Sequence, residues 1–154
     1  MEKTAIIDGS YRYLLKRVWD VNNPQITFIM LNPSTADAEK DDPTIRKCIK
    51  FANSWGYGSL EVVNLFAYRA TKPRDLFQVS EPIGSDNNLY LLAAAERAKL
   101  IILAWGIHGS FLKRDRTVLN LFSSRQCLYC LGRTKAGHPR HPLWLDSSTQ
   151  PTIF

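Results

Sequence analysis

Four apolar runs alternate with helical segments along this chain, and this order constrains the fold more than any other feature. The runs cover residues 25–31, 60–68, 100–105 and 127–131. The first run is nearly continuous and contains β-branched and aromatic side chains, which is typical of a strand covered on both faces. We therefore predict an α/β fold, a three-layer α/β/α sandwich with a four-stranded, mostly parallel sheet.

Capping and turn signals mark the helices between these runs. Asp42-Pro43 predicts the start of a helix with apolar residues at helical spacing, and Gly56 predicts its end. A second helix is expected after residue 84 and a third over residues 112–122. Strand, loop and helix therefore follow one another several times, as in right-handed βαβ units.

The N-terminal part of the chain predicts a β-hairpin at one edge of the sheet. Residues 5–19 have strand-forming side chains around a turn signal at Asp8-Gly9. No repeat, low-complexity tract or linker divides the 154 residues, so a single domain is expected over 1–154. Within it we expect the hairpin in residues 1–24, an α/β core in 25–145 and a C-terminal tail in 146–154.

Composition narrows the class of protein. Hydrophobic residues make up 45% and charged residues 22%, which excludes a disordered chain. The chain has neither the ~20-residue apolar stretch of a membrane span nor the start of a signal peptide. Three cysteines, an odd number, suit a reducing compartment, so a soluble cytoplasmic protein is expected. The net charge of +6 favours anionic partners.

Polar clusters follow the four apolar runs. Ligands of open α/β sheets bind beyond the carboxyl ends of the strands, where such clusters would meet. Each cluster could instead serve only to turn the chain, but four at one edge favour a binding site. The clusters are residues 32–35 with 41–44, Asn64 with 69–73, 105–108, and 133–142.

Several of these segments together resemble the pattern of a bacterial and phage family, the domain of unknown function (DUF) 1643. The similarity spans most of the chain, from the first apolar run to about Leu145, and the family name carries no activity. The segments are Phe28-Ile29-Met30-Leu31-Asn32-Pro33-Ser34, Asp41-Asp42-Pro43-Thr44, Val63-Asn64-Leu65-Phe66, Arg69-Ala70-Thr71 and Gly137-His138-Pro139-Arg140-His141-Pro142-Leu143.

The core also resembles the uracil-DNA glycosylase superfamily fold. In that superfamily a first parallel strand ends in a motif that positions the hydrolytic water, and a late strand ends in a His-Pro-Ser or Asn-Pro-Ser turn. Leu31-Asn32-Pro33-Ser34 is similar to the first motif, with Ser34 in place of a glycine. His141-Pro142-Leu143 falls where the late motif would lie, without its serine, and Asp41-Asp42-Pro43-Thr44 has no clear counterpart.

This second resemblance implies hydrolysis of the glycosidic bond of a nucleobase in nucleic acid or in a nucleotide, without metal or cofactor. Asn32 would hold the water through its carbonyl oxygen, and His141 would donate to the departing base. Substrate contacts are expected from Pro33, Ser34, Asp41, Asn64, Phe66, Arg69, Trp105, Arg133, His138 and Arg140.

Other interpretations remain open. Asn32 could cap a local Asn-Pro turn, and Asp41 or Asp42 could act as a general base or a metal ligand. A catalytically inert module that binds a nucleotide or modified base would use the same pocket, as would an enzyme on free nucleotides. Cys127 and Cys130 lie three apart on a predicted strand and so face opposite sides, which argues against a shared metal ion.

Overall fold

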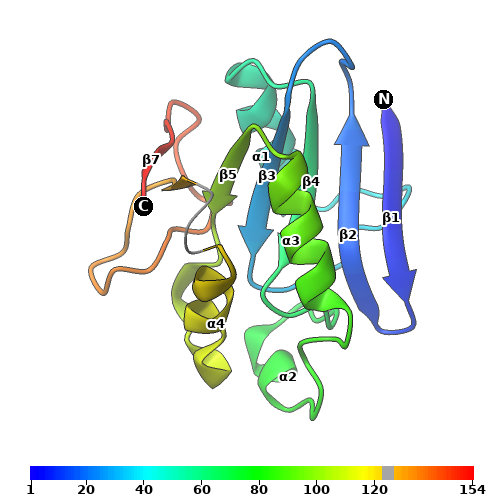
Figure 1. The fold of residues 1–154 in the computed structure, drawn as a ribbon, viewed down its shortest axis with the longest axis vertical. Coiled ribbons are helices and arrows are strands. Elements are labelled where there is room, and N and C mark those ends of the chain that lie inside the picture. Colours follow the sequence, from blue (N-terminus) through cyan, green and yellow to red (C-terminus); the bar gives the residue numbers. More distant parts are fainter. Residues whose placement is uncertain (123–126) are drawn as a thin grey trace.

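A computed structural model describes residues 1–122 and 127–154 of the chain (Figure 1). The described part forms one sheet with the strand order β1-β2-β4-β3-β5-β6-β7. The strands are β1 (Glu2–Asp8), β2 (Tyr11–Val18), β3 (Gln25–Met30), β4 (Ser59–Asn64), β5 (Leu100–Leu103), β6 (Leu128–Cys130) and β7 (Thr152–Ile153).

The sheet is mixed and larger than the predicted four strands. The central strands β4, β3, β5 and β6 are parallel, at the positions where the four apolar runs predict strands. The predicted hairpin, β1 with β2, joins the sheet because β2 pairs antiparallel with β4. Residues 146–154, expected as a tail, supply β7, which pairs antiparallel with β6. The sheet therefore has seven strands: the hairpin extends it at one edge, and β7, which was not predicted, extends it at the other.

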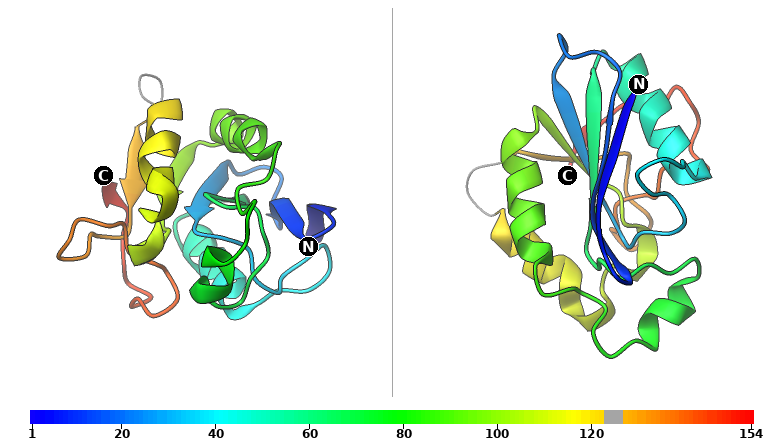
Figure 2. Two further views of the ribbon diagram at one scale, coloured as in Figure 1. Left: turned by 90° about the horizontal axis from the view of Figure 1, so that it is seen from below. Right: turned by 90° about the vertical axis from the view of Figure 1, so that its right-hand side faces the viewer.

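Helices cover both faces of the sheet (Figure 2). α1 packs on one face, and α3 and α4 pack on the other. The helices are α1 (Pro43–Ser54), α2 (Pro73–Phe77), α3 (Asn87–Arg97) and α4 (Arg114–Leu121), with short 3₁₀ turns at η1 (Gly106–His108) and η2 (Phe111–Lys113). None of the described helices has both the length and the apolar character needed to cross a membrane.

The apolar sequence of β3 follows from this double coverage. Ile26, Phe28 and Met30 pack in the cluster beneath α1. Ile29, which points to the opposite face, packs in the cluster beneath α3 and α4. Both faces of the strand are therefore removed from water, and alternation between apolar and polar residues is lost.

The connections place a topological switch point at the end of β3. The chain passes from β3 through α1 to β4 on one side, and it later returns through α3 to β5 on the other side of β3. The segments that leave β3 and β5 therefore turn toward opposite faces of the sheet. In open α/β sheets such a divergence leaves a crevice beyond the carboxyl ends of the strands.

Candidate functional site

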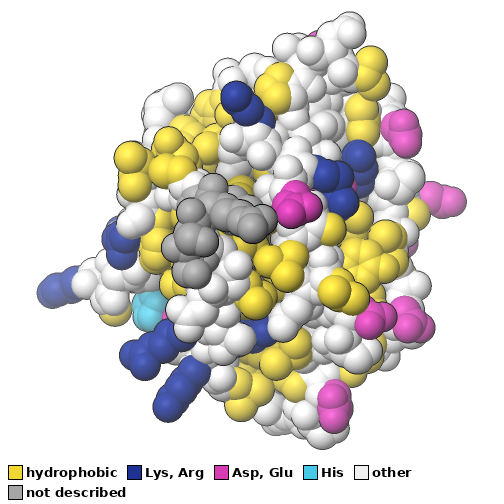
Figure 3. Space-filling view, viewed as in Figure 1, with side chains coloured by type: hydrophobic (Ala, Val, Ile, Leu, Met, Phe, Trp, Pro, Cys, Tyr) yellow, Lys and Arg dark blue, Asp and Glu magenta, His cyan; other side chains and the backbone are white. Residues whose placement is uncertain are grey.

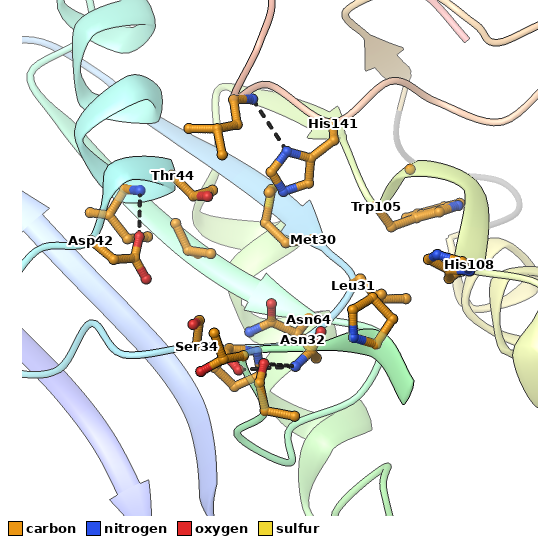
Figure 4. A pocket seen from close by; sticks show the side chains of 18 of the residues that line it. Met30, Leu31, Asn32, Ser34, Asp42, Thr44, Asn64, Trp105, His108 and His141 are labelled. Atoms are coloured by element: carbon orange, nitrogen blue, oxygen red, sulfur yellow. Dashed lines mark hydrogen bonds between the residues drawn. The ribbon is translucent and has the colours of Figure 1, made fainter. Parts of the chain in front are cut away.

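A cavity of about 520 Å³ lies at this switch point (Figure 4). Its wall is built from the carboxyl ends of β3 and β4, the segments that follow β3, β4 and β5, the start of α1, and residues 141–143. All four polar clusters contribute to it, although the last one contributes only its end. Apolar side chains such as Met30, Val62 and Ile107 form much of the remaining wall. The cavity therefore has the mixed lining of a small-molecule site.

Half of the site residues predicted from the sequence line this cavity. Asn32 and His141, predicted to hold the water and to donate to the base, both line it, and Figure 4 shows them on either side of Met30 and Leu31. The predicted residues that line the cavity are Asn32, Pro33, Ser34, Asn64, Trp105 and His141.

Three of the other predicted contacts lie behind the wall and support it. Asp41 accepts hydrogen bonds from Lys3 (3.2 Å) and Arg17 (2.8 Å), so it anchors the loop that precedes α1 to the hairpin. Phe66 is fully buried in the core beneath α3 and α4. Arg69 donates to the backbone oxygens of residues 34 and 35 and lines a neighbouring hollow. None of these side chains lines the cavity.

The remaining predicted contacts belong to the segment that follows β6. The Arg133 guanidinium lies over the ring of Phe154, 3.9 Å from the centroid, and donates to the backbone oxygen of that residue. His138 closes a tight turn with Thr134, whose hydroxyl accepts from the His138 N–H at 3.1 Å. Arg140 is exposed. This segment therefore folds on itself, and only His141 and Leu143 reach the cavity.

Asn64 ends β4 with a buried amide that has no partner. The residue is 1% exposed, and neither Oδ1 nor Nδ2 finds a hydrogen-bond partner in the described part of the chain. Its backbone is fixed, because Asn87 Nδ2 donates to the Asn64 carbonyl at 2.9 Å. An amide buried without partners costs free energy, and such groups are rare in folded proteins. Since this side chain lines the cavity, its missing partners fit a ligand.

Asn32 is held by its nitrogen. Nδ2 donates to the Ala70 carbonyl at 2.8 Å and to the Pro33 carbonyl at 3.0 Å. These contacts fix the orientation of the amide and leave Oδ1 as its acceptor. The two carbonyls come from the segments that follow β3 and β4, so the crossover topology itself sets the direction of the Asn32 side chain.

His141 lies at the exposed rim of the cavity in a defined tautomer. Its Nδ1 accepts a hydrogen bond from the Leu143 N–H at 3.2 Å (Figure 4). In the neutral ring the proton must therefore sit on Nε2. Protein atoms around the ring withdraw water from it and lower the pKa of His141 below 6.5, while the charge of Asp42 opposes this shift. The His141 side chain is therefore a neutral imidazole that can donate a hydrogen bond through its Nε2–H.

Asp42 is the acidic residue that faces the cavity, and it caps α1. One carboxylate oxygen accepts from the Ile45 N–H at 2.9 Å and the other accepts from the Ala36 N–H at 3.3 Å. Both oxygens therefore stabilise the backbone, which leaves little capacity for general-base chemistry. Among the described residues, no group of three or more His, Cys, Asp or Glu side chains is arranged to hold a metal ion.

Sequence reasoning missed Arg12, a buried residue of the cavity wall. It is 2% exposed, and its Nη1 donates to the Ala36 carbonyl at 3.0 Å. Burial lowers the pKa of Arg12 to about 10, so the side chain remains charged at neutral pH. A charged residue among Tyr11, Tyr13 and Leu14 in a predicted strand was the available signal, because burying a charge is expensive.

Of the comparisons with known proteins, the one with family models finds a match. No curated protein and no solved structure matches the chain significantly. A family model described as "Protein of unknown function (DUF1643)" matches residues 12–143. The matched span includes every residue that lines the cavity, from Arg12 to Leu143. Because the match covers most of its length, this chain belongs to the DUF1643 family.

Proposed function

We propose that the cavity binds a nucleobase and that the protein hydrolyses the N-glycosidic bond of that base. The observation that carries this proposal is the buried, unpartnered amide of Asn64. Its N–H₂ and C=O groups point in neighbouring directions and complement a base edge that offers a carbonyl beside an N–H, as in uracil, thymine, guanine and hypoxanthine. Leaving such an amide unpaired would penalise analogues that lack this edge.

The other walls of the cavity suit a flat heterocycle. Trp105 is 2% exposed and lines the cavity, and its Nε1 has no hydrogen-bond partner within the described residues. Met30, Val62 and Leu143 add apolar contacts. A lining of apolar and aromatic groups with a few fixed polar atoms favours a ligand with two apolar faces and a polar edge.

His141 and Asn32 can serve the two ends of the hydrolysis. Water attacks the anomeric carbon, the C–N bond breaks, and its electron pair leaves with the base. The water releases one proton to solvent as it becomes the new hydroxyl group, and the base takes up one proton from solvent. The Nε2–H of His141 would donate to the base oxygen on which negative charge develops. Asn32 Oδ1 would accept from the attacking water and orient it, although an amide cannot take up the proton. The resemblance of the two strand-end motifs to those of uracil-DNA glycosylases supports these assignments.

A second candidate function is nucleotide binding without turnover. The hydrogen bonds of Asp42 favour this function, because both of its carboxylate oxygens already accept from backbone N–H groups. In the described wall of the cavity, Asp42 is the only carboxylate, so no unengaged general base is at hand. Binding and release of the base must therefore be measured separately.

Base release tests the proposal directly. The full chain is incubated with nucleosides, nucleotides, and single- and double-stranded oligonucleotides that carry uracil or modified pyrimidines, and the free base is measured by chromatography. We expect Asn32→Ala to lower the release rate about 10-fold or more while binding is retained. Asn120→Ala, an exposed asparagine on α4, is the matched control. Saturable binding without release assigns the inert module, and absence of binding excludes both functions.

A further inference from the structure

Two buried arginines of β2, Arg12 and Arg17, lie on the same face of the sheet and differ sharply in their partners. Arg17 forms an ion pair with Asp41 at 2.8 Å and donates to four backbone oxygens, those of residues 4, 16, 37 and 40. Arg12 donates to one, the Ala36 carbonyl, and its Nε has no partner in residues 1–122 and 127–154. No carboxylate of the described chain forms an ion pair with Arg12. Its charge is therefore incompletely compensated.

A β-bulge directs Arg12 into the cavity. The register of β1 with β2 pairs Ile6 with Leu14 and Ile7 with Arg12, so Tyr13 is an extra residue. Tyr13 and Leu14 consequently both lie on the α3 face, where Tyr13 stacks on Tyr90 at 5.1 Å. Regular alternation would place Arg12 with Leu14, whereas the bulge turns it to the α1 face. Bulges near active sites commonly serve to redirect a side chain in this way.

The charges around Arg12 leave room for an anion. Asp42 and Asp37 act on it with negative charge, and Arg17 and Arg69 act with positive charge. Of the two carboxylates, Asp42 lines the cavity and is committed to capping α1. The N-terminal end of this 12-residue helix also forms part of the wall, and it adds partial positive charge.

We propose that Arg12 binds the phosphate of a nucleoside monophosphate whose base lies against Asn64. The position of the base in this inference rests on the proposed function. The position of the phosphate is inferred from Arg12 and does not depend on that function. A guanidinium that lines a cavity and whose Nε has no partner in the described chain is suited to a phosphate group. The substrate class is then the free mononucleotide.

The burial of Arg12 favours a phosphate monoester over an internal phosphate of a nucleic-acid strand. At 2% exposure, its guanidinium is reached through the cavity and not from the outer surface. An internal phosphodiester carries a nucleotide on each side, and both neighbours would have to leave a cavity of about 520 Å³ by separate routes. A monoester has one substituent and needs no second exit.

Calorimetry with matched ligands tests this assignment. The probes are uridine, deoxyuridine, guanosine and inosine, their 5′-monophosphates, inorganic phosphate, and a single-stranded uracil oligonucleotide without terminal phosphates. We expect at least one monophosphate to bind about 10-fold or more tighter than its nucleoside. Arg12→Met should remove this ratio and keep the nucleoside affinity, and Arg12→Lys should retain part of it. Arg116→Met, an exposed arginine on α4, is the control.

The wild-type comparison keeps the test decisive if a variant fails to fold. Equal affinity for nucleosides and their monophosphates would overturn the phosphate assignment and leave the base proposal standing. Tighter binding of the unphosphorylated oligonucleotide than of any monophosphate would overturn it too. Binding of inorganic phosphate that Arg12→Met abolishes, with no nucleoside bound, would support the anion site and exclude the base site. Absence of binding by every probe would overturn both.

Discussion

Asn64 and Arg12 are polar residues that the fold buries without satisfying them. Each loses contact with water and gains too few hydrogen bonds in return, so each lowers the stability of the empty protein. Strand positions facing a core are normally filled by apolar side chains. Their presence together at one cavity is the pattern expected of a ligand site, because binding sites commonly sacrifice stability for function.

Substitution of Asn64 by an apolar residue of similar shape separates stability from function. We expect Asn64→Leu to leave the free energy of unfolding unchanged or to raise it by about 1 kcal/mol, because two unpaired polar atoms leave the interior. Binding of nucleosides should be lost in the same variant. Urea denaturation and calorimetry measure the two effects. A loss of more than about 2 kcal/mol would instead identify Asn64 as a stabilising residue.

The tautomer of His141 predicts a specific pH dependence. Because its pKa is lowered, the folded protein holds this ring neutral below pH 6.5, where the unfolded chain already takes up the proton. The free energy of unfolding should therefore fall as the pH drops from 6.5 through the pKa of the folded state. Protonation would also place a hydrogen on Nδ1 and break the bond from the Leu143 N–H.

Nuclear magnetic resonance can follow this titration. The His141 ring signals should show a midpoint below 6.5, and the Leu143 amide signal should shift with the same midpoint. His141→Gln should remove that transition from the Leu143 amide. A midpoint above 6.5 would mean that the ring is stabilised in its charged form, which contradicts the assigned tautomer.

Among the elements, α1 links the fold to the cavity most directly. Its cap, Asp42, also holds the loop that carries Ala36, whose carbonyl accepts from Arg12. Asp42→Ala should lower the free energy of unfolding by about 2 kcal/mol, near the upper end for a lost cap, since two backbone donors lose their acceptor. Asp42→Asn should lose less, because its amide oxygen still accepts from the Ile45 N–H, but its Nδ2 cannot accept from the Ala36 N–H. Equal losses in urea denaturation would show that the carboxylate charge or the Ala36 bond, and not the cap on the Ile45 N–H, dominates.

The elements also show what local sequence can and cannot reveal. The start of α1 follows from Asp42-Pro43 alone, since cap and first-turn residues are adjacent in the chain. Local sequence does not show whether Asp41 or Asp42 faces the cavity. Asp41 is held away from the cavity by Arg17, which lies 24 residues from it in the chain. The bulge at Tyr13 depends on pairing with β1, and the two-residue strand β7 depends on pairing with β6. Neither carries a sequence pattern of its own.

At the scale of the whole molecule, the cavity is predictable because strand order determines it. Apolar runs identify the parallel strands, and right-handed crossovers bring their carboxyl ends to one edge, so the convergence of Asn32, Asn64 and Trp105 needs no side-chain detail. Strand order does not predict the positions of Arg133 and Arg140, because the long segment that follows the last parallel strand folds on itself before it reaches the edge of the sheet.

The distribution of charge offers a competing binding surface. Lys and Arg side chains project over α4 and the segment of residues 132–140, at the lower left of Figure 3. A nucleic-acid strand bound through phosphate contacts would use such an exposed basic face. A mononucleotide in the cavity would instead contact segments that are far apart in the sequence, and none of the residues that line the cavity belongs to 132–140.

Hydrogen exchange measured by mass spectrometry distinguishes these two surfaces. With the tightest-binding nucleoside monophosphate at saturation, exchange should slow in residues 30–36, 42–45, 105–108 and 141–143, because a ligand that binds only the folded state suppresses local opening of the segments it joins. Residues 132–138 and β1, which lie outside the cavity wall, should keep their rates and serve as an internal control. Protection concentrated in residues 113–116 and 132–140 would place the ligand on the basic face. This result would contradict binding of the nucleotide in the cavity.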